Sequence, residues 1–223
     1  MTTLYKDKTE CPNCNDEVEY TDLMSTNSMG YPDLDLRPPP MQRDTLHTYI
    51  KVCHSCGCRF AKIYPKELFR DEIIKSPEYL KILDDAKKTS LAKDFLAYAY
   101  ICTMGKDFKE SYEYQLYAAW VCDDHNLELE AIECRKQAYL SIRKSQSYPN
   151  GFVNNKTRGV VLVDILRRAK EFNECQKLIK HLDKIIQGSK IENEDIMLKV
   201  LKYQFELADK KDSKCYTLDF LAN

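Results

Sequence analysis

The stretch Cys53-His-Ser-Cys56-Gly57, together with the earlier Cys11-Pro-Asn-Cys14, decides how the first part of this chain folds. Two cysteines separated by two residues reach one ion when the backbone turns sharply after the second cysteine. Asn15 and Gly57 follow the second cysteines, and these residue types most readily adopt the positive φ of such a turn. The pattern predicts a metal site whose ligands are Cys11, Cys14, Cys53 and Cys56.

Four thiolates around one ion form the closed tetrahedral site of structural zinc, with no open position for a catalytic water. We therefore predict a structural Zn²⁺. An iron–sulfur cluster uses the same ligand set and is an alternative. A redox dithiol is a third interpretation, disfavoured because the pairs flank predicted strands instead of opening a helix. The 38 residues between the pairs exceed the usual spacing of roughly 15–20, which predicts a folded or partner-binding insertion.

The other cysteines and the nearby histidines are not predicted to be metal ligands. Cys58 lies on the same strand face as Phe60, so we expect a small buried side chain rather than an alternative ligand. His54 and His47 are expected at the surface. Core packing is the expectation for the cysteines outside this region, which are Cys102, Cys122, Cys134, Cys175 and Cys215.

The composition favours a cytoplasmic protein. The 34 lysines and arginines nearly balance 35 aspartates and glutamates, so no overall field steers the chain toward nucleic acid or an anionic membrane. The N-terminal residues lack the apolar region of a signal peptide, and no stretch approaches the roughly 18 apolar residues of a membrane span. Ten cysteines arranged partly in C-x-x-C pairs then indicate a reducing compartment.

The chain divides into two parts of different pattern, and we predict a domain in each: residues 1–64 and residues 65–223. Residues 17–24 and 46–52 alternate apolar and polar side chains as strands do, whereas residues 25–45 hold four prolines and are predicted not to be helical. After residue 65, capping residues such as Ser76, Asp107 and Asn126 begin helical patterns. The six longer helices are expected at about 90–104, 107–123, 126–145, 157–170, 173–187 and 193–209.

Short turns between these segments predict antiparallel helical hairpins. Two sets of small residues, each spaced 12 and then 7 apart, match the close helix contacts of tetratricopeptide units. Both sets claim the helix at 107–123, so the two registers exclude each other, and a plain helical bundle is the alternative. The fold class is therefore mostly α, with a small zinc-ribbon-like β module followed by a tetratricopeptide-like array. The two sets are Ala119, Ala131, Ala138 and Ala99, Ser111, Ala118.

The insertion Tyr31-Pro-Asp-Leu-Asp-Leu-Arg-Pro-Pro-Pro-Met-Gln-Arg43 is the least generic stretch. In an extended segment its charged residues project on one side and its leucines on the other. Its arginines have the chemistry to bind a carboxylate or phosphate. Alternatively, Arg37 pairs with an aspartate of the same segment and the leucines fill a domain interface. The candidate contacts for a ligand or partner are Asp33, Asp35, Arg37, Met41 and Arg43.

A cysteine pair, a segment close to MSTNS-x-G-x-PDLD-x-RPP-x-M, a second pair and a helical region together resemble an uncharacterised bacterial family of cytosolic zinc-ribbon proteins. The specific part of the resemblance runs from Cys11 to about residue 63. His54 departs from the usual C-P-x-C-G, which does not disturb metal binding. The resemblance implies a shared zinc module and supplies no activity.

These observations favour a non-catalytic interaction or scaffold protein whose helical domain binds a protein or peptide. A run of aromatic residues between Tyr98 and Trp120 offers anchors for such a partner, although half of them are expected in the core. A nucleic-acid-binding zinc ribbon is the alternative, opposed by seven basic against nine acidic residues in residues 1–65. No phosphate loop, nucleophile elbow or zinc-protease motif supports an enzyme.

Overall fold

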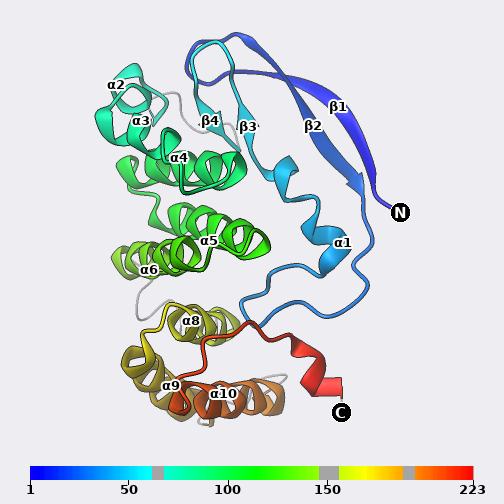
Figure 1. Cartoon of the computed structure of the whole chain (residues 1–223), viewed down its shortest axis with the longest axis vertical. Helices are drawn as coiled ribbons and strands as arrows, with labels where there is room; N and C mark the ends of the chain where they lie inside the picture. Colours follow the sequence, from blue (N-terminus) through cyan, green and yellow to red (C-terminus); the bar gives the residue numbers. More distant parts are fainter. Residues whose placement is uncertain (62–67, 146–155, 188–193, 223) are drawn as a thin grey trace.

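The computed structural model describes residues 1–61, 68–145, 156–187 and 194–222, which are mostly helical with a small β module at the N-terminal end (Figure 1). The prediction of a mostly α fold with a small N-terminal β module is thereby confirmed, while the predicted boundary at residues 64 and 65 lies outside the described residues. The strands are β1 (Thr3–Glu10), β2 (Glu17–Ser25), β3 (Lys51–Val52) and β4 (Arg59–Phe60). The α-helices are α1 (Pro40–Arg43), α2 (Asp71–Ile74), α3 (Pro77–Leu83), α4 (Ser90–Met104), α5 (Phe108–Asp124), α6 (Glu128–Lys144), α8 (Lys156–Arg168), α9 (Phe172–Gln187) and α10 (Glu194–Asp209). Two 3₁₀ helices are η1 (Leu46–Tyr49) and η3 (Leu218–Ala222).

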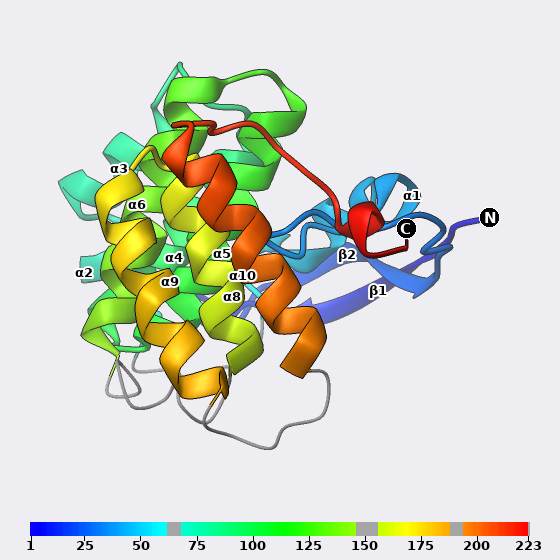
Figure 2. The same cartoon turned by 90° about the horizontal axis from the view of Figure 1, so that it is seen from below.

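The β module consists of two antiparallel hairpins. β1 pairs with β2, and its last pair, Glu10 with Glu17, leaves the first cysteine pair in the connecting turn. β3 pairs with β4 from Lys51 opposite Phe60 to Val52 opposite Arg59, which leaves the second cysteine pair in that turn. Figure 2 shows the β1–β2 ribbon extending away from the helices. Because β1 is almost wholly exposed, it carries no alternation of burial that a sequence pattern would reveal.

The structure corrects two predictions in the insertion. Residues 46–52 were predicted to be one strand, but η1 precedes β3 because Thr45 and Thr48 donate hydroxyl hydrogen bonds to backbone carbonyls three residues earlier, at 2.7 and 2.9 Å. The proline-rich stretch was predicted to lack helix, but α1 forms one turn there. Pro40 stands at its first position, where the missing N–H of proline costs no hydrogen bond.

The long helices lie within a few residues of the predicted ranges, and the same turn ends four of them. A residue with positive φ follows the helix, and the next N–H bonds the carbonyl five residues earlier at 2.9 Å in every case. Asn126, predicted as an N-cap, is instead one of these left-handed residues, and Leu127 takes the N-cap position. The left-handed residues are Lys106, Asn126, Lys170 and Lys211.

The helices stack side by side along the longest axis of the molecule (Figure 1). Both sets of small residues predicted at close helix contacts are buried, on α4, α5 and α6. Ser111 on α5 joins its neighbours, because its hydroxyl lies 2.8 Å from that of Thr103 on α4 and 3.4 Å from that of Ser141 on α6. The relation of these helices to tetratricopeptide repeats stays a prediction. Among the described helices, none has both the length and the apolar composition for crossing a membrane.

Two apolar clusters hold the chain together. The first joins residues of the β module, including Val18, Ile50 and Phe60, to residues of α2 through α8. The second lies among α8, α9 and α10, and Leu34 from the insertion is buried in it. The β module and the helices therefore share their core, and burial of these side chains is the main favourable term that joins them.

Candidate metal centre

The four predicted ligands meet in one cluster. The sulfurs of Cys11, Cys14, Cys53 and Cys56 all lie within 4.8 Å of one another, and none of these cysteines forms a disulfide. The pairs Cys11–Cys56 and Cys14–Cys53 are each separated by 3.6 Å. Sulfurs placed at about 2.3 Å around a tetrahedral ion would lie about 3.8 Å apart. The cluster can therefore hold one metal ion with little rearrangement.

Each cysteine pair is shaped by the same backbone turn. In the first, Asn15 N–H donates to the Cys11 carbonyl at 3.0 Å; in the second, Gly57 N–H donates to the Cys53 carbonyl at 2.9 Å. Asn15 has φ of 63° and Gly57 has φ of 78°, as their residue types suggested. Cys11 N–H and Cys53 N–H then bond carbonyls five residues ahead, at 2.8 and 2.9 Å. The two halves of the site are thus near-equivalent, which suits a symmetric ligand set.

The environment of the thiols favours ionisation at one of them. Burial raises the pKa of Cys53, but the Cys56 backbone N–H and the thiols of Cys11 and Cys14 outweigh it and lower the pKa to about 7. For the other three ligands burial is the largest influence and raises the pKa. The hydrogen bonds within the cluster therefore favour a thiolate among its four sulfurs, the form in which cysteine binds a metal.

The neighbours of the cluster do not extend it. Cys58 is completely buried and outside the four-sulfur group, and burial raises the pKa of its thiol well above the usual range. His54 and His47 are exposed, as predicted. Asn13, which lies between the first two cysteines, donates a hydrogen bond to Asp71 of α2 at 3.0 Å, so this short helix borders the site.

The insertion between the two pairs lies against the helices. Residues 32–37, which we call the docking loop, pair with the C-terminal segment: Leu34 N–H donates to the Tyr216 carbonyl at 3.0 Å, and Leu218 N–H donates to the Pro32 carbonyl at 2.9 Å. Asp33 and Thr217 form an isolated antiparallel bridge. Figure 1 shows the C-terminal segment crossing from α10 to the insertion. The docking loop thus joins segments from opposite ends of the chain.

Asp35 of the docking loop is fully buried in a cluster of donors. One carboxylate oxygen accepts from Trp120 Nε1 at 3.0 Å, from Arg135 Nη2 at 3.0 Å and from Arg168 Nη1 at 3.2 Å. Burial raises the pKa of Asp35, but the charges of Arg168 and Arg135 outweigh it and lower the pKa to about 2. Asp35 is therefore a carboxylate in the folded protein, held by α5, α6 and α8.

Of the remaining candidate contacts, Arg37 and Arg43 also lie at this interface. Arg37 Nε pairs with Asp33 at 2.5 Å, and Arg37 Nη1 donates to Asp124 at 3.0 Å. Arg43 donates to the Pro38 carbonyl at 2.9 Å and approaches Asp33 at 3.4 Å, whereas Met41 is 40% exposed. The sequence analysis left open that Arg37 pairs with an aspartate of its own segment, and its ion pair with Asp33 is such a contact. A contact of these residues with a separate ligand stays a prediction.

Three residues of this interface were not among the sequence candidates: Trp120, Arg135 and Arg168. Arg135 did carry a signal, because it lies four residues after Ala131 and three before Ala138, both predicted at helix contacts. An arginine on that face must be paired when buried. Trp120 was predicted only as one of the aromatic anchors. Tyr114, another of those anchors, donates its hydroxyl hydrogen bond to the Tyr49 carbonyl of the insertion at 3.2 Å. Four of the anchors are buried, namely Tyr98, Tyr112, Tyr114 and Trp120.

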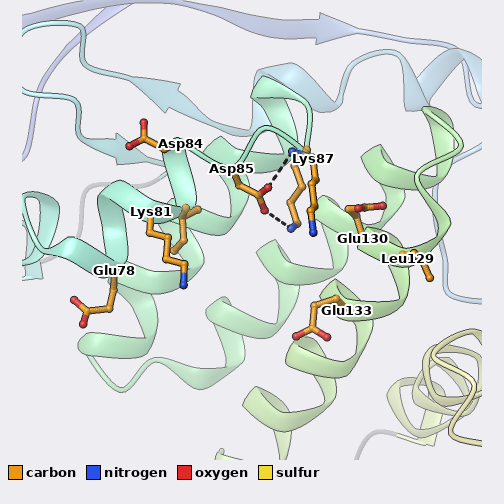
Figure 3. A pocket seen from close by; sticks show the side chains of 10 residues that line it. Glu78, Lys81, Asp84, Asp85, Lys87, Leu129, Glu130 and Glu133 are labelled. Atoms are coloured by element: carbon orange, nitrogen blue, oxygen red, sulfur yellow. Dashed lines mark hydrogen bonds and ion pairs between the residues drawn. The ribbon is translucent and has the colours of Figure 1, made fainter.

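A hollow of about 760 Å³ lies on the surface between α3, the following turn and α6. Figure 3 shows charged side chains of both signs around it, and the hydrogen bond and ion pair drawn there both involve Asp85. Lys88 pairs with Asp85 at 2.6 Å, and Leu129 at the edge is 74% exposed. Carboxylates and lysines line most of the hollow, and these are ordinary residue types of a protein surface.

Acid should weaken the interface at Asp35. Because its pKa is lower in the folded than in the unfolded chain, the stabilisation by Asp35 is fully present above about pH 4 and is lost as the pH falls toward 2. Urea unfolding of the wild type and Asp35→Asn at pH 5 and pH 3 should show a difference in unfolding free energy that shrinks at the lower pH. A difference that stays constant would contradict the assigned ionisation.

The two leucines of the docking loop should differ in their contribution to stability. Leu34 is 2% exposed within the second cluster, whereas Leu36 is 44% exposed. We expect Leu34→Ala to lower the unfolding free energy by about 2–4 kcal/mol, because it leaves a cavity. Leu36→Ala, the matched control, should change it far less. Chemical denaturation of both variants checks this, and equal effects would show that the loop does not insert Leu34 in solution.

Comparison of the chain with models of protein families, with curated proteins and with solved structures finds no match. The resemblance to a bacterial zinc-ribbon family therefore stays a prediction.

Proposed function

We propose that this chain is a non-catalytic scaffold protein, in which a structural zinc ion holds the insertion in place and the helical region binds a protein or peptide partner. The observation that carries the proposal is the position of the insertion. The four-cysteine cluster fixes both of its ends, and the docking loop lies buried against three helices between them. A metal bound by this cluster would therefore hold the two ends of the insertion together.

The ligand set supports zinc in that role. Four sulfur donors at tetrahedral spacing leave no position for water or substrate, which is the arrangement of structural zinc sites. The exposed charges on the β1–β2 ribbon give little support to the nucleic-acid alternative, because Lys6 and Lys8 pair with Glu19 and Glu17 at 2.9 and 2.7 Å. A zinc ion with four thiolates would add further negative charge, which opposes contacts with phosphates.

Affinity purification of the tagged full-length chain, with and without RNase and DNase, tests the class of partner. We expect the same protein to be recovered under both conditions and after a wash at high salt. Leu129→Arg serves as a matched surface variant that leaves the docking loop untouched. Recovery of nucleic acid alone, lost on nuclease treatment or at high salt, would contradict the proposal and favour the nucleic-acid alternative.

A further inference from the structure

The docking loop is seated on the protein as a short bound peptide would be. Its backbone forms an antiparallel pairing with the C-terminal segment, with Asp33 opposite Thr217. Its apolar side chain, Leu34, enters the cluster between α8 and α10, and its next side chain, Asp35, enters a cluster of donors. Backbone pairing for affinity and side-chain pockets for specificity are how proteins recognise extended peptides.

The two arginines on the helical side of this interface also have a partner outside the loop. Asp123 of α5 accepts hydrogen bonds from Arg135 at 2.6 Å and from Arg168 at 2.8 Å, so a residue outside the loop helps to orient both guanidinium groups. Trp120 Nε1 points at the same oxygen of Asp35 as they do. Three donors that converge on one point, on helices and in a buried place, need an anion there, because unpaired buried donors are costly.

The charges around this point select the kind of anion. Asp123 already pairs with both Arg135 and Arg168, so a dianionic phosphate at this point would be repelled, whereas a single carboxylate is matched. Arg37, two residues after Asp35, lies over these acids, 3.0 Å from Asp124 and 3.9 Å from Asp123. The surface therefore suits an extended peptide with leucine, aspartate and, two residues later, a basic side chain.

We propose that Trp120, Arg135 and Arg168 form a peptide-binding site for such an aspartate-containing segment of a partner protein, and that the docking loop occupies the site as an intramolecular ligand. This inference rests on the proposed function and names the partner's chemistry. The loop is not an ideal occupant, because Leu36 is held at φ of 64°, a conformation that disfavours leucine, while its side chain is 44% exposed. A partner segment without that strain competes with the loop.

Because the loop is tethered, its effective concentration at the site is on the order of millimolar, and a free peptide must overcome it. The test therefore weakens the loop and leaves the helical residues unchanged. Full-length Leu34→Ser is titrated with a peptide that has the sequence of residues 29–40, and the fluorescence of Trp120, the single tryptophan of the chain, reports occupancy. We expect saturable binding at least tenfold tighter than to the wild type. The same peptide carrying Asp35→Asn should bind at least tenfold more weakly.

Adding Arg168→Met to Leu34→Ser is the matched control and should abolish the fluorescence change. A folded Leu34→Ser protein that binds neither peptide at millimolar concentration, or both equally, overturns the inference. If Leu34→Ser does not fold by circular dichroism, hydrogen exchange of the wild type decides: excess peptide should raise exchange in residues 29–40, and the Asn peptide should not. No rise overturns the inference.

The two proposals fail separately. If affinity purification recovers a protein but the peptide does not bind, the scaffold function stands without this site. If only nucleic acid is recovered, the scaffold function falls whatever the peptide does.

Discussion

Cys53→Ser is expected to release the metal and to unfold the β module. Cys53 is buried in the same apolar cluster as Phe60 and residues of α2 through α6, so loss of its ligand opens a core that the helices share. Structural zinc supplies much of the folding free energy of small modules, and we expect a loss of about 5 kcal/mol or more. Hydrogen exchange should show lost protection in residues 11–60, while α9, whose core lies in the second cluster, stays protected.

Cys58→Ala is the matched control, because Cys58 is buried two residues beyond the site but lies outside the four-sulfur cluster. It should keep one metal ion per chain and lose only the packing of its thiol. If Cys58→Ala loses the metal and Cys53→Ser keeps it, the ligand assignment is wrong.

Asp35→Ala should be the most damaging change outside the metal site. It leaves Arg135 and Arg168 buried with one carboxylate fewer between them, and Trp120 loses its acceptor. Removing one partner of a buried ion pair costs about 3–5 kcal/mol, because the remaining charge is uncompensated. Urea denaturation followed by tryptophan fluorescence measures the loss.

The exposed pair of Lys6 and Glu19 provides the control for this variant. Both side chains are more than half exposed, so Glu19→Gln should leave the midpoint of denaturation unchanged. If Asp35→Ala is equally silent, the docking loop does not hold the helices together in solution.

The sequence was sufficient to predict the cysteine cluster, because the chemistry of its two halves is local. A C-x-x-C pair followed by Asn15 or Gly57 specifies both the ligand type and the turn, and only the meeting of the two pairs is a tertiary fact. The helix ranges were also readable, because caps and apolar periodicity act within a few residues. The turns that end the helices were harder to predict, since lysine rather than glycine occupies three of the four left-handed positions.

The interface at Asp35 could not be read in the same way. Its partners Trp120, Arg135 and Arg168 lie 85 to 133 residues away along the chain, and no spacing rule connects them. A charged residue in a proline-rich loop is most often solvated, so the sequence left a ligand contact and an internal ion pair both open. Only Arg135, which lies on a predicted helix contact, indicated that a negatively charged partner from another part of the chain was needed.

We infer that the four cysteines form a closed zinc site that anchors the insertion. X-ray absorption at the zinc edge, on the purified full-length chain, tests it most directly. We predict one zinc per chain with four sulfur neighbours at about 2.3 Å and no lighter ligand. A chain without zinc, or a first shell that contains nitrogen or oxygen, would contradict the claim.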